Sequence, residues 1–259
     1  MIVKQLCMPR QARIRFSPRR ATRRHWLVTT IASALVLLGG GGAIPVAARQ
    51  ASSQHDGLPA VLAEGTDRLP MPEVAWRIVA DVAELPGEAA FEERALGFAF
   101  WSTDPLRLTD QMTGAERVIG QTEAAFVADG VTEKRESLGG QTASYLRLAV
   151  VPSERRDDPG GDRLIFAGDP FPALDGERSL TLYETDLRAG DPVVVVGSGA
   201  PTLVLVLQGS VTVATDAGLT DLTTVVGSGT SYAAGSFDGN VRFVANRDAT
   251  FVAFATIGA

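Results

Sequence analysis

Residues 164–259 alternate short apolar runs with turns rich in Gly, Pro, Asp and Asn, and this alternation constrains the fold more than any other feature of the sequence. Val, Ile and Thr, which favour strands, make up 26 of these 96 residues. Short strands separated by turns every 8 to 12 residues or so are typical of antiparallel sandwiches and barrels. We therefore expect an all-β fold here. The expected strands are 180–186, 193–196, 203–207, 211–215, 219–226, 241–244 and 250–256.

The preceding part of the chain is less regular, but its landmarks recur about 105 residues later, which predicts an internal duplication. We expect a linker before the first copy, at residues 49–70, and another between the two copies, at residues 152–163. Neither segment has a sustained apolar period. Two globular halves follow from this, at 71–151 and 164–259. The matched segments are Leu85–Glu88 with Leu187–Asp191, Thr109–Asp110 with Thr215–Asp216, and Phe126–Gly130 with Ser231–Gly235.

The N-terminal segment 1–48 has the composition of an export signal. It carries eight basic residues and no acid. Arg23 and Arg24, ahead of an apolar run, resemble the twin-arginine export signature. Small residues then favour cleavage after Ala48; alternatively, residues 26–48 stay uncleaved as a membrane anchor. In both cases we expect the rest of the chain to be exported across the bacterial cytoplasmic membrane, secreted or extracytoplasmic, and to meet the membrane only through this segment.

The side chains that supply most soft-metal ligands, thiol nucleophiles and neutral-pH bases are confined to the start of the chain. Cys7, His25 and His55 are its only Cys and His. Beyond them we expect no disulfide, no transition metal and no imidazole-assisted nucleophile. Residues 49–259 also hold 30 acidic and 16 basic groups, a net charge of −14. Such a charge repels phosphate backbones, so nucleic acid is not an expected partner, and no cofactor is predicted.

The glycine spacing of residues 190–238 resembles that of the cupin family. Gly190 and Gly209 stand at the glycines of the first cupin motif, and Gly227 and Gly235 at those of the second. Glycines at such turns adopt backbone conformations that other residues avoid. The resemblance implies two tandem jelly-roll β-barrels, a bicupin, after the signal or anchor segment. It also implies a degenerate site, because the metal-ligand positions are occupied by Val196, Ser198, Thr202 and Asp238.

The first half fits the cupin frame more loosely, with Glu93 and Glu133 at ligand-like positions. Two carboxylates can hold Ca²⁺ or Mg²⁺ when waters complete the shell, although two solvated acids are the plainer interpretation. Some metal-free cupins work by acid–base chemistry with a tyrosine, and Tyr145, Tyr183 and Tyr232 are available for it. No catalytic site is predicted outright. The candidates for an acid–base role are Glu93, Glu133, Tyr183 and Asp238.

Aromatic residues of the first half have two interpretations. Trp76, Phe98, Phe100 and Trp101 could form a wall for a sugar or an apolar ligand. Aromatic side chains at alternating strand positions usually belong to the core, however. We expect them to be core residues.

Two classes of function remain open. A module that binds a small molecule or an extracytoplasmic protein fits a cupin scaffold whose metal ligands are replaced. The alternative is a metal-free isomerase or lyase that uses carboxylate and tyrosine groups as acid and base. The four acid–base candidates discriminate between these classes. If they converge inside one barrel beside a cavity, an enzyme is favoured; if Val, Leu and Phe fill both barrels, a surface interaction remains.

Overall fold

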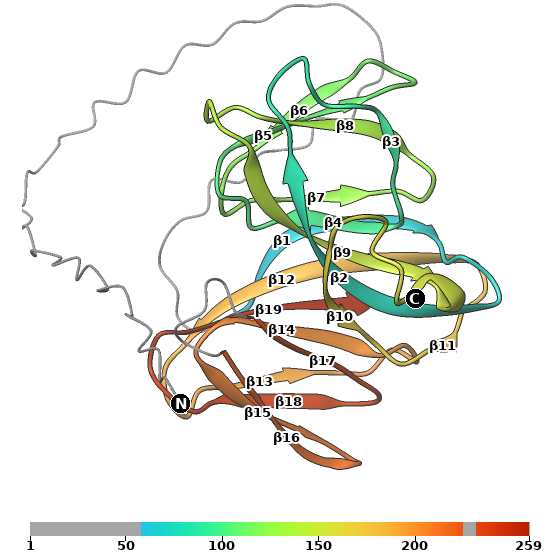
Figure 1. Cartoon of the computed structure of the whole chain (residues 1–259). Helices are drawn as coiled ribbons and strands as arrows, with labels where there is room; N and C mark the ends of the chain where they lie inside the picture. The colour runs from blue at the N-terminus through green and yellow to red at the C-terminus, as the bar shows by residue number, and fades with distance from the viewer. Residues whose placement is uncertain (1–57, 225–231, 259) are drawn as a thin grey trace, which may run out of the picture. The chain divides into compact units, whose positions relative to one another are not determined.

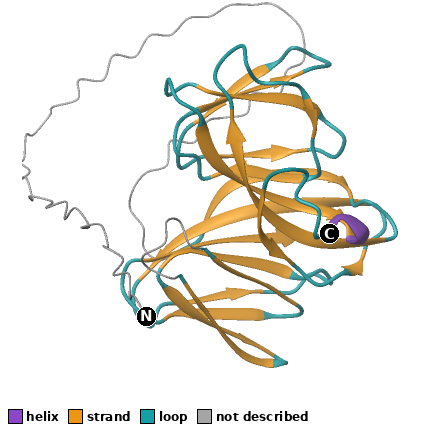
Figure 2. Cartoon of the chain, viewed as in Figure 1, coloured by secondary structure: helices purple, strands orange, loops and turns teal. Residues whose placement is uncertain are grey.

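The computed structural model describes residues 58–224 and 232–258, which belong to one compact unit. The expected export signal, the start of the 49–70 linker and the turn around Gly227 lie outside the described residues. The described chain consists of strands with one short 3₁₀ turn, Ser153–Arg155, which confirms the all-β prediction (Figure 2). Within these two ranges, no helix is long and apolar enough to span a bilayer.

The first half forms a large and a small antiparallel sheet. The large sheet has the order β10-β2-β9-β4-β7, and β11 also pairs with β2; the small sheet has the order β3-β8-β5-β6. The strands are β2 (Glu73–Ala83), β3 (Glu92–Glu93), β4 (Gly97–Phe100), β5 (Leu106–Asp110), β6 (Glu116–Ile119), β7 (Ala124–Val127), β8 (Thr132–Ser137), β9 (Ala143–Pro152), β10 (Arg163–Ala167) and β11 (Phe171–Pro172).

The second half is built in the same way, from a large sheet with the order β1-β12-β19-β14-β17 and a small one with the order β13-β18-β15-β16. The strands are β1 (Ala60–Arg68), β12 (Glu177–Leu187), β13 (Pro192–Val195), β14 (Thr202–Gln208), β15 (Ser210–Thr215), β16 (Gly218–Thr223), β17 (Ala233–Phe237), β18 (Val241–Ala245) and β19 (Thr250–Ile257). Seven of these nine strands match expected ones; β1 and β17 were not foreseen.

The two halves repeat one strand order. Adding ten to each number in β2-β9-β4-β7 and β3-β8-β5-β6 gives the sheets of the second half. This is the order of an eight-stranded jelly roll, so each half is a jelly-roll barrel, as the duplication and the cupin resemblance imply. Gly190 and Gly209 have φ angles of 87° and 99°, which explains why glycine occupies these two turns. Gly235, within β17, does not have a positive φ.

Two segments pair with sheets in a way that the sequence does not predict. Residues 60–68, part of the expected linker, form β1 and pair with β12 of the second barrel. Residues 163–172 form β10 and β11, which pair with β2 of the first barrel. Both extensions cover strands that would otherwise be sheet edges with unpaired backbone groups. The linker prediction at 60–68 is therefore wrong, because long-range backbone pairing, which no local pattern encodes, orders this segment.

The largest hydrophobic core lies between the two large sheets, not inside a barrel. Buried side chains of β2, β4 and β9 share one cluster with those of β12, β14 and β19, and Figure 1 shows these sheets as adjacent layers. Trp76, Phe98 and Phe100 belong to this cluster, which confirms their expected core role. A second cluster of Val, Leu and Phe fills the second barrel. The first barrel is the one with a polar interior.

Candidate functional site

The interior of the first barrel is apolar at one end and charged at the other. Leu106, Leu108 and Ile119 pack with small residues at the apolar end. Successive residues of a strand point to opposite faces of the sheet. Trp76 and Ile78 of β2 face the inter-barrel core, so Arg77 and Asp81 point into the first barrel. The other charged and phenolic side chains buried at this end are Arg94 before β4, Glu133 and Arg135 of β8, and Tyr145 of β9; Arg147 of β9 is half-buried beside them.

Asp81 is the centre of this charged end. It lies directly opposite Tyr145 across the β2–β9 ladder and accepts a short hydrogen bond from the Tyr145 hydroxyl. Its Oδ2 also lies 3.4 Å from Arg94 Nη1 and 3.3 Å from Arg147 Nε. Burial alone would raise the pKa of Asp81, but Arg147, the Tyr145 hydrogen bond and Arg94 outweigh it, and the pKa is lowered. Asp81 is therefore an ionised, fully engaged carboxylate.

Tyr145 links Asp81 to a second ion pair deeper in the barrel. Arg135 Nη1 donates a hydrogen bond of 3.1 Å to the Tyr145 hydroxyl oxygen. Arg135 Nη2 and Nε lie 2.5 and 2.7 Å from Glu133 Oε1. Burial and the nearby Asp81 charge raise the pKa of Tyr145. The phenol therefore keeps its proton and donates a hydrogen bond to Asp81.

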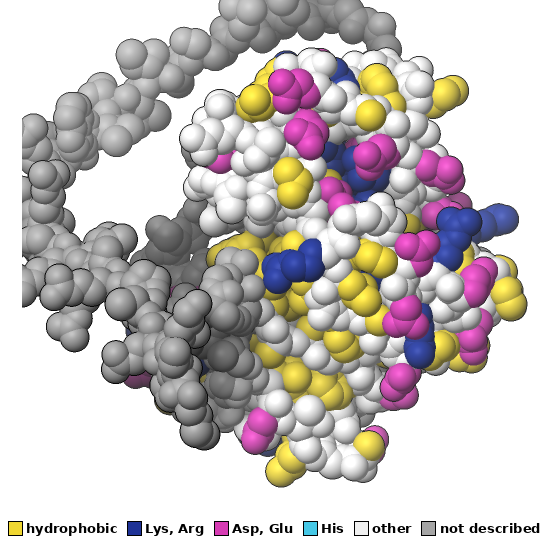
Figure 3. Space-filling model, viewed as in Figure 1, with side chains coloured by type: hydrophobic (Ala, Val, Ile, Leu, Met, Phe, Trp, Pro, Cys, Tyr) yellow, Lys and Arg dark blue, Asp and Glu magenta, His cyan; other side chains and the backbone are white. Residues whose placement is uncertain are grey.

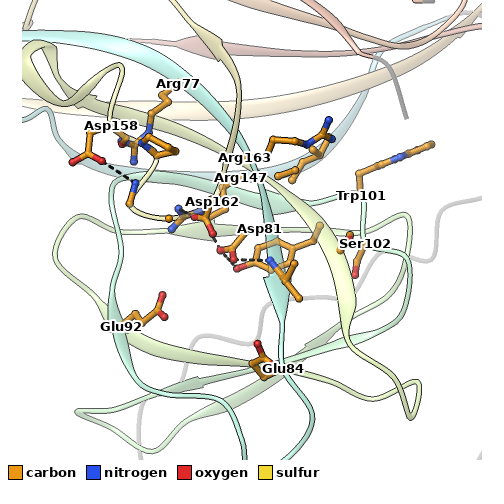
Figure 4. Close-up of a pocket in the computed structure, with 18 of the residues that line it drawn as sticks. Arg77, Asp81, Glu84, Glu92, Trp101, Ser102, Arg147, Asp158, Asp162 and Arg163 are labelled. Atoms are coloured by element: carbon orange, nitrogen blue, oxygen red, sulfur yellow. Dashed lines mark hydrogen bonds and ion pairs between the residues drawn. The ribbon is translucent and has the colours of Figure 1, made fainter. Parts of the chain in front are cut away.

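Asp162, just before β10, closes this network toward solvent. Its carboxylate accepts a short hydrogen bond from Arg147 Nη2, and the Asp162 side chain is 22% exposed. Partial burial and the nearby Asp81 charge raise the pKa of Asp162 to about 6. Asp81 and Asp162 thus share Arg147, but their pKa values shift in opposite directions, because one carboxylate is compensated on several sides and the other on one (Figure 4).

A pocket of about 920 Å³ opens above these groups. Arg77, Asp81, Tyr145, Arg147 and Asp162 line it, together with Tyr232 of the second barrel. Figure 4 shows charged side chains of both signs facing this space from β2, β9 and the segment before β10. On the face of the molecule drawn in Figure 3, basic side chains likewise lie among acidic ones.

Trp101 forms part of the same wall and has an unusual backbone. Its φ is 54°, the left-handed region that bulky residues rarely adopt. The indole packs against Phe251 of β19 with ring centroids 5.2 Å apart. It is half-buried and lines the pocket. Of the four aromatic residues that the sequence analysis assigns to the core, Trp101 is the one that borders the ligand-sized space.

The four acid–base candidates do not converge. Glu133 lies inside the first barrel but is paired with Arg135, and Glu93 is an exposed residue that lines the pocket. Tyr183 stacks on Phe254 in the second barrel, with ring centroids 4.8 Å apart. Asp238 is exposed in a turn. The carboxyl and phenol groups that the fold brings together are instead those of Asp81, Tyr145 and Asp162.

The degenerate cupin positions are equally dispersed. Val196 is 77% exposed, whereas Thr202 is 3% exposed. The Ser198 hydroxyl donates a short hydrogen bond to the Ile257 carbonyl. These side chains do not converge on a common point, and with Asp238 they offer few of the donors that a cupin metal needs.

The first barrel does not fit a cation any better. Arg77, Arg94, Arg135 and Arg147 surround its charged end, and their field repels a metal ion. Within residues 58–224 and 232–258, no group of three His, Cys, Asp or Glu is placed to hold one. That the protein binds no transition metal stays a prediction, which elemental analysis of the purified protein can check.

The sequence does contain a signal for this site, namely charged residues at inward-facing positions of a buried strand. Residues 73–83 have the pattern of a buried strand, yet Arg77 and Asp81 lie on the same face of this strand as the apolar Ala75, Val79 and Ala83. Charged residues at inward positions are rare unless they are paired. Inward charges on the neighbouring strand β9, at Arg147, mark the same end of the barrel.

Comparisons with known proteins find distant similarity to solved structures. No family model and no curated protein matches the chain. Among similar solved structures, YhaK from Escherichia coli is 15% identical and has a TM-score of 0.45, covering 76% of this chain and 94% of its own. A cupin 2 conserved barrel domain protein from Leptotrichia buccalis is 10% identical, with a TM-score of 0.39 and coverages of 75% and 88%. The bacterial pirin YhhW from Escherichia coli, in complex with nickel(II), is 12% identical, with a TM-score of 0.43 and coverages of 71% and 83%. Two of these three structures are described as a cupin and a pirin.

Proposed function

We propose that the first barrel binds a small, hydroxylated organic anion of the sugar-acid class. The observation that carries this proposal is the pocket of about 920 Å³ with Arg77, Asp81, Arg147 and Asp162 in its lining. Small-molecule sites commonly measure about 300 to 1,000 Å³. The second barrel is filled by its apolar cluster.

Unpaired cations in the lining indicate an anionic ligand. Arg155 and Arg163 are exposed in the pocket lining and make no ion pair with any described residue. The Arg77 guanidinium donates only to the backbone carbonyls of Arg155 and Asp158. A carboxylate on the ligand would pair with these guanidinium groups in the bidentate manner that arginine favours.

The remaining lining suits hydroxyl groups and one apolar ring face. Asp162, Glu84 and Ser102 offer hydrogen-bond acceptors, and Ser102 also offers a donor. Trp101 offers a flat apolar surface of the kind on which sugar rings pack. A purely apolar ligand would remove Arg155 and Arg163 from water without giving them a partner, which is costly.

Calorimetric titration with gluconate and galacturonate, and with neutral galactose as comparison, tests this proposal. We expect saturable binding of an acid and none of the neutral sugar. Arg163→Gln should weaken binding about tenfold, since a hydrogen bond to a charged group contributes about 1.5 kcal/mol or more. The matched control is Arg188→Gln, at an exposed turn of the second barrel. If both variants bind the acids as the parent does, or if no acid binds, the pocket assignment is wrong.

A second candidate, a metal-free isomerase or lyase, is favoured by one observation. The Asp81–Asp162 carboxyl pair, joined through Arg147, gives Asp162 a pKa of about 6, which suits a group that exchanges protons near neutral pH. Tyr145, held by Asp81 and Arg135, lines the same space. In this interpretation Asp162 moves the proton and Arg147 orients the ligand.

The pH dependence of stability reports on Asp162. Its pKa rises from 3.8 in a free chain to about 6 in the fold, so between these values the folded protein holds a proton that the unfolded chain has lost. The free energy of unfolding must therefore fall as pH rises through this window, by about 1 kcal/mol after allowance for partial exposure. Asp162→Asn should remove this slope in thermal melts. Asp157→Asn, at a side chain 72% exposed, should keep it; equal slopes in all three proteins would refute the raised pKa.

We also propose that residues 1–48 direct export through the twin-arginine route. The paired Arg23 and Arg24 support this, together with the apolar run after them. Replacing both arginines by lysine should retain the protein in the cytoplasmic fraction, whereas the parent should be exported. N-terminal sequencing of the exported protein separates cleavage after Ala48 from an uncleaved anchor.

A further inference from the structure

A second, much smaller cavity lies inside the first barrel, and it is lined by four arginines. Its volume is about 10 Å³, and Arg77, Arg94, Arg135 and Arg147 border it together with apolar side chains such as Phe98 and Leu148. We propose that this cavity binds one monatomic anion, with chloride as the physiological occupant. The site is separate from the organic-anion pocket, because Arg94 and Arg135 line only the small cavity.

The buried charge around this cavity is more positive than negative. Three buried guanidinium groups, those of Arg77, Arg94 and Arg135, and the half-buried one of Arg147 face two buried carboxylates, Asp81 and Glu133. The other acids in contact are nearer solvent: Glu92, the second partner of Arg94, is 60% exposed, and Asp162 is 22% exposed. Buried charges without compensation are strongly unfavourable, so an anion among the guanidinium groups would stabilise the fold.

Unused hydrogen-bond donors indicate the same ligand. The Nε atoms of Arg77 and Arg94 are inaccessible to solvent and make no hydrogen bond to any described residue, whereas Arg147 Nε lies 3.3 Å from the Asp81 carboxylate. All three side chains border the small cavity. Arg77 makes no ion pair with a carboxylate of the described chain, and burial together with the nearby Arg147 charge lowers its pKa. Buried N–H groups in proteins nearly always have a partner.

The size of the cavity restricts the occupant to a single atom or a water. A cavity of about 10 Å³ has room for roughly one water-sized particle, which excludes phosphate, sulfate and carboxylates. A water could accept from two of the N–H groups, but it would leave the excess positive charge uncompensated. A halide compensates this charge and accepts from several donors at once, so the observations favour the halide over the water.

Chloride binding to the purified full chain is the direct test. The melting temperature should rise with sodium chloride, by about 5 to 10 °C at one hundred times the dissociation constant. Sodium methanesulfonate at equal ionic strength should not produce this rise, because its anion is too large. Long-wavelength X-ray data should show anomalous density among the four guanidinium groups, which distinguishes chloride from water. Equal melting in both salts, with density no stronger than that of a water, would overturn the proposal.

Two variants separate this site from the organic-anion pocket. Arg94→Met should abolish the chloride response. Arg163→Gln should weaken the binding of sugar acids about tenfold and keep the chloride response, because Arg163 lines only the larger pocket. If Arg94→Met does not fold, the anomalous density of the parent protein decides alone. A chloride response that survives in a folded Arg94→Met variant would also count against the site.

Discussion

Asp81→Ala should lower the free energy of unfolding by about 3 to 5 kcal/mol, the cost of removing one partner from a buried ionic network. The Asp81 side chain is 10% exposed and contacts both Arg94 and Arg147. Its loss would leave these two guanidinium groups facing each other with less compensation and the Tyr145 hydroxyl without its acceptor. Urea unfolding at fixed chloride concentration measures the effect.

Two further variants serve as comparisons for Asp81→Ala. Asp81→Asn keeps the shape and an acceptor for Tyr145 but removes the charge, so it should fall between the parent and Asp81→Ala. Asp169→Ala is the matched control, because Asp169 is fully exposed and lies 3.9 Å from Arg156; exposed pairs of this kind contribute about 0 to 1 kcal/mol. If Asp81→Ala costs no more than Asp169→Ala, the charged end of the barrel is not the tightly coupled network described above.

Trp76→Ala should cost a similar amount, about 3 to 5 kcal/mol, for a different reason. Trp76 is fully buried in the core that the two barrels share. Its Nε1 donates a hydrogen bond of 2.8 Å to the Pro201 carbonyl of the second half. Truncation would therefore open a cavity at the inter-barrel contact and leave a buried carbonyl unpaired. Trp76→Phe keeps most of the ring and should cost about 1 to 3 kcal/mol, chiefly from the lost hydrogen bond.

The shared core also predicts how the protein unfolds. Because the largest cluster belongs to both barrels, calorimetry should show one cooperative transition for the parent, and Trp76→Ala should lower its temperature or split it in two. Met112→Ala, at a side chain 88% exposed, should change stability by less than about 0.5 kcal/mol. Two well-separated transitions in the parent protein would contradict a common core.

The candidate site was only partly accessible from the sequence. Glu93, Glu133 and Asp238 stand at ligand spacings of the cupin frame, Tyr183 is an available tyrosine, and the fold disperses all four. Spacing along a strand fixes which face a side chain occupies, but not what lies opposite it. Asp81 meets Tyr145 because of the β2–β9 register, and Asp162 reaches Arg147 because β10 joins the first barrel.

The sequence by itself determined the all-β class and the duplication, and its glycine spacing implied the jelly roll through the resemblance to cupins. Turn glycines such as Gly190 and Gly209 and alternating Val, Ile and Thr are local signals, and local signals set where strands begin and end. Only the tertiary structure decided which barrel β1 and β10 join, that the main core lies between the large sheets, and that one barrel interior is ionic. These features depend on contacts between residues far apart in the chain, such as Trp76 with Pro201, whose energies depend on burial and pairing that a linear pattern does not contain.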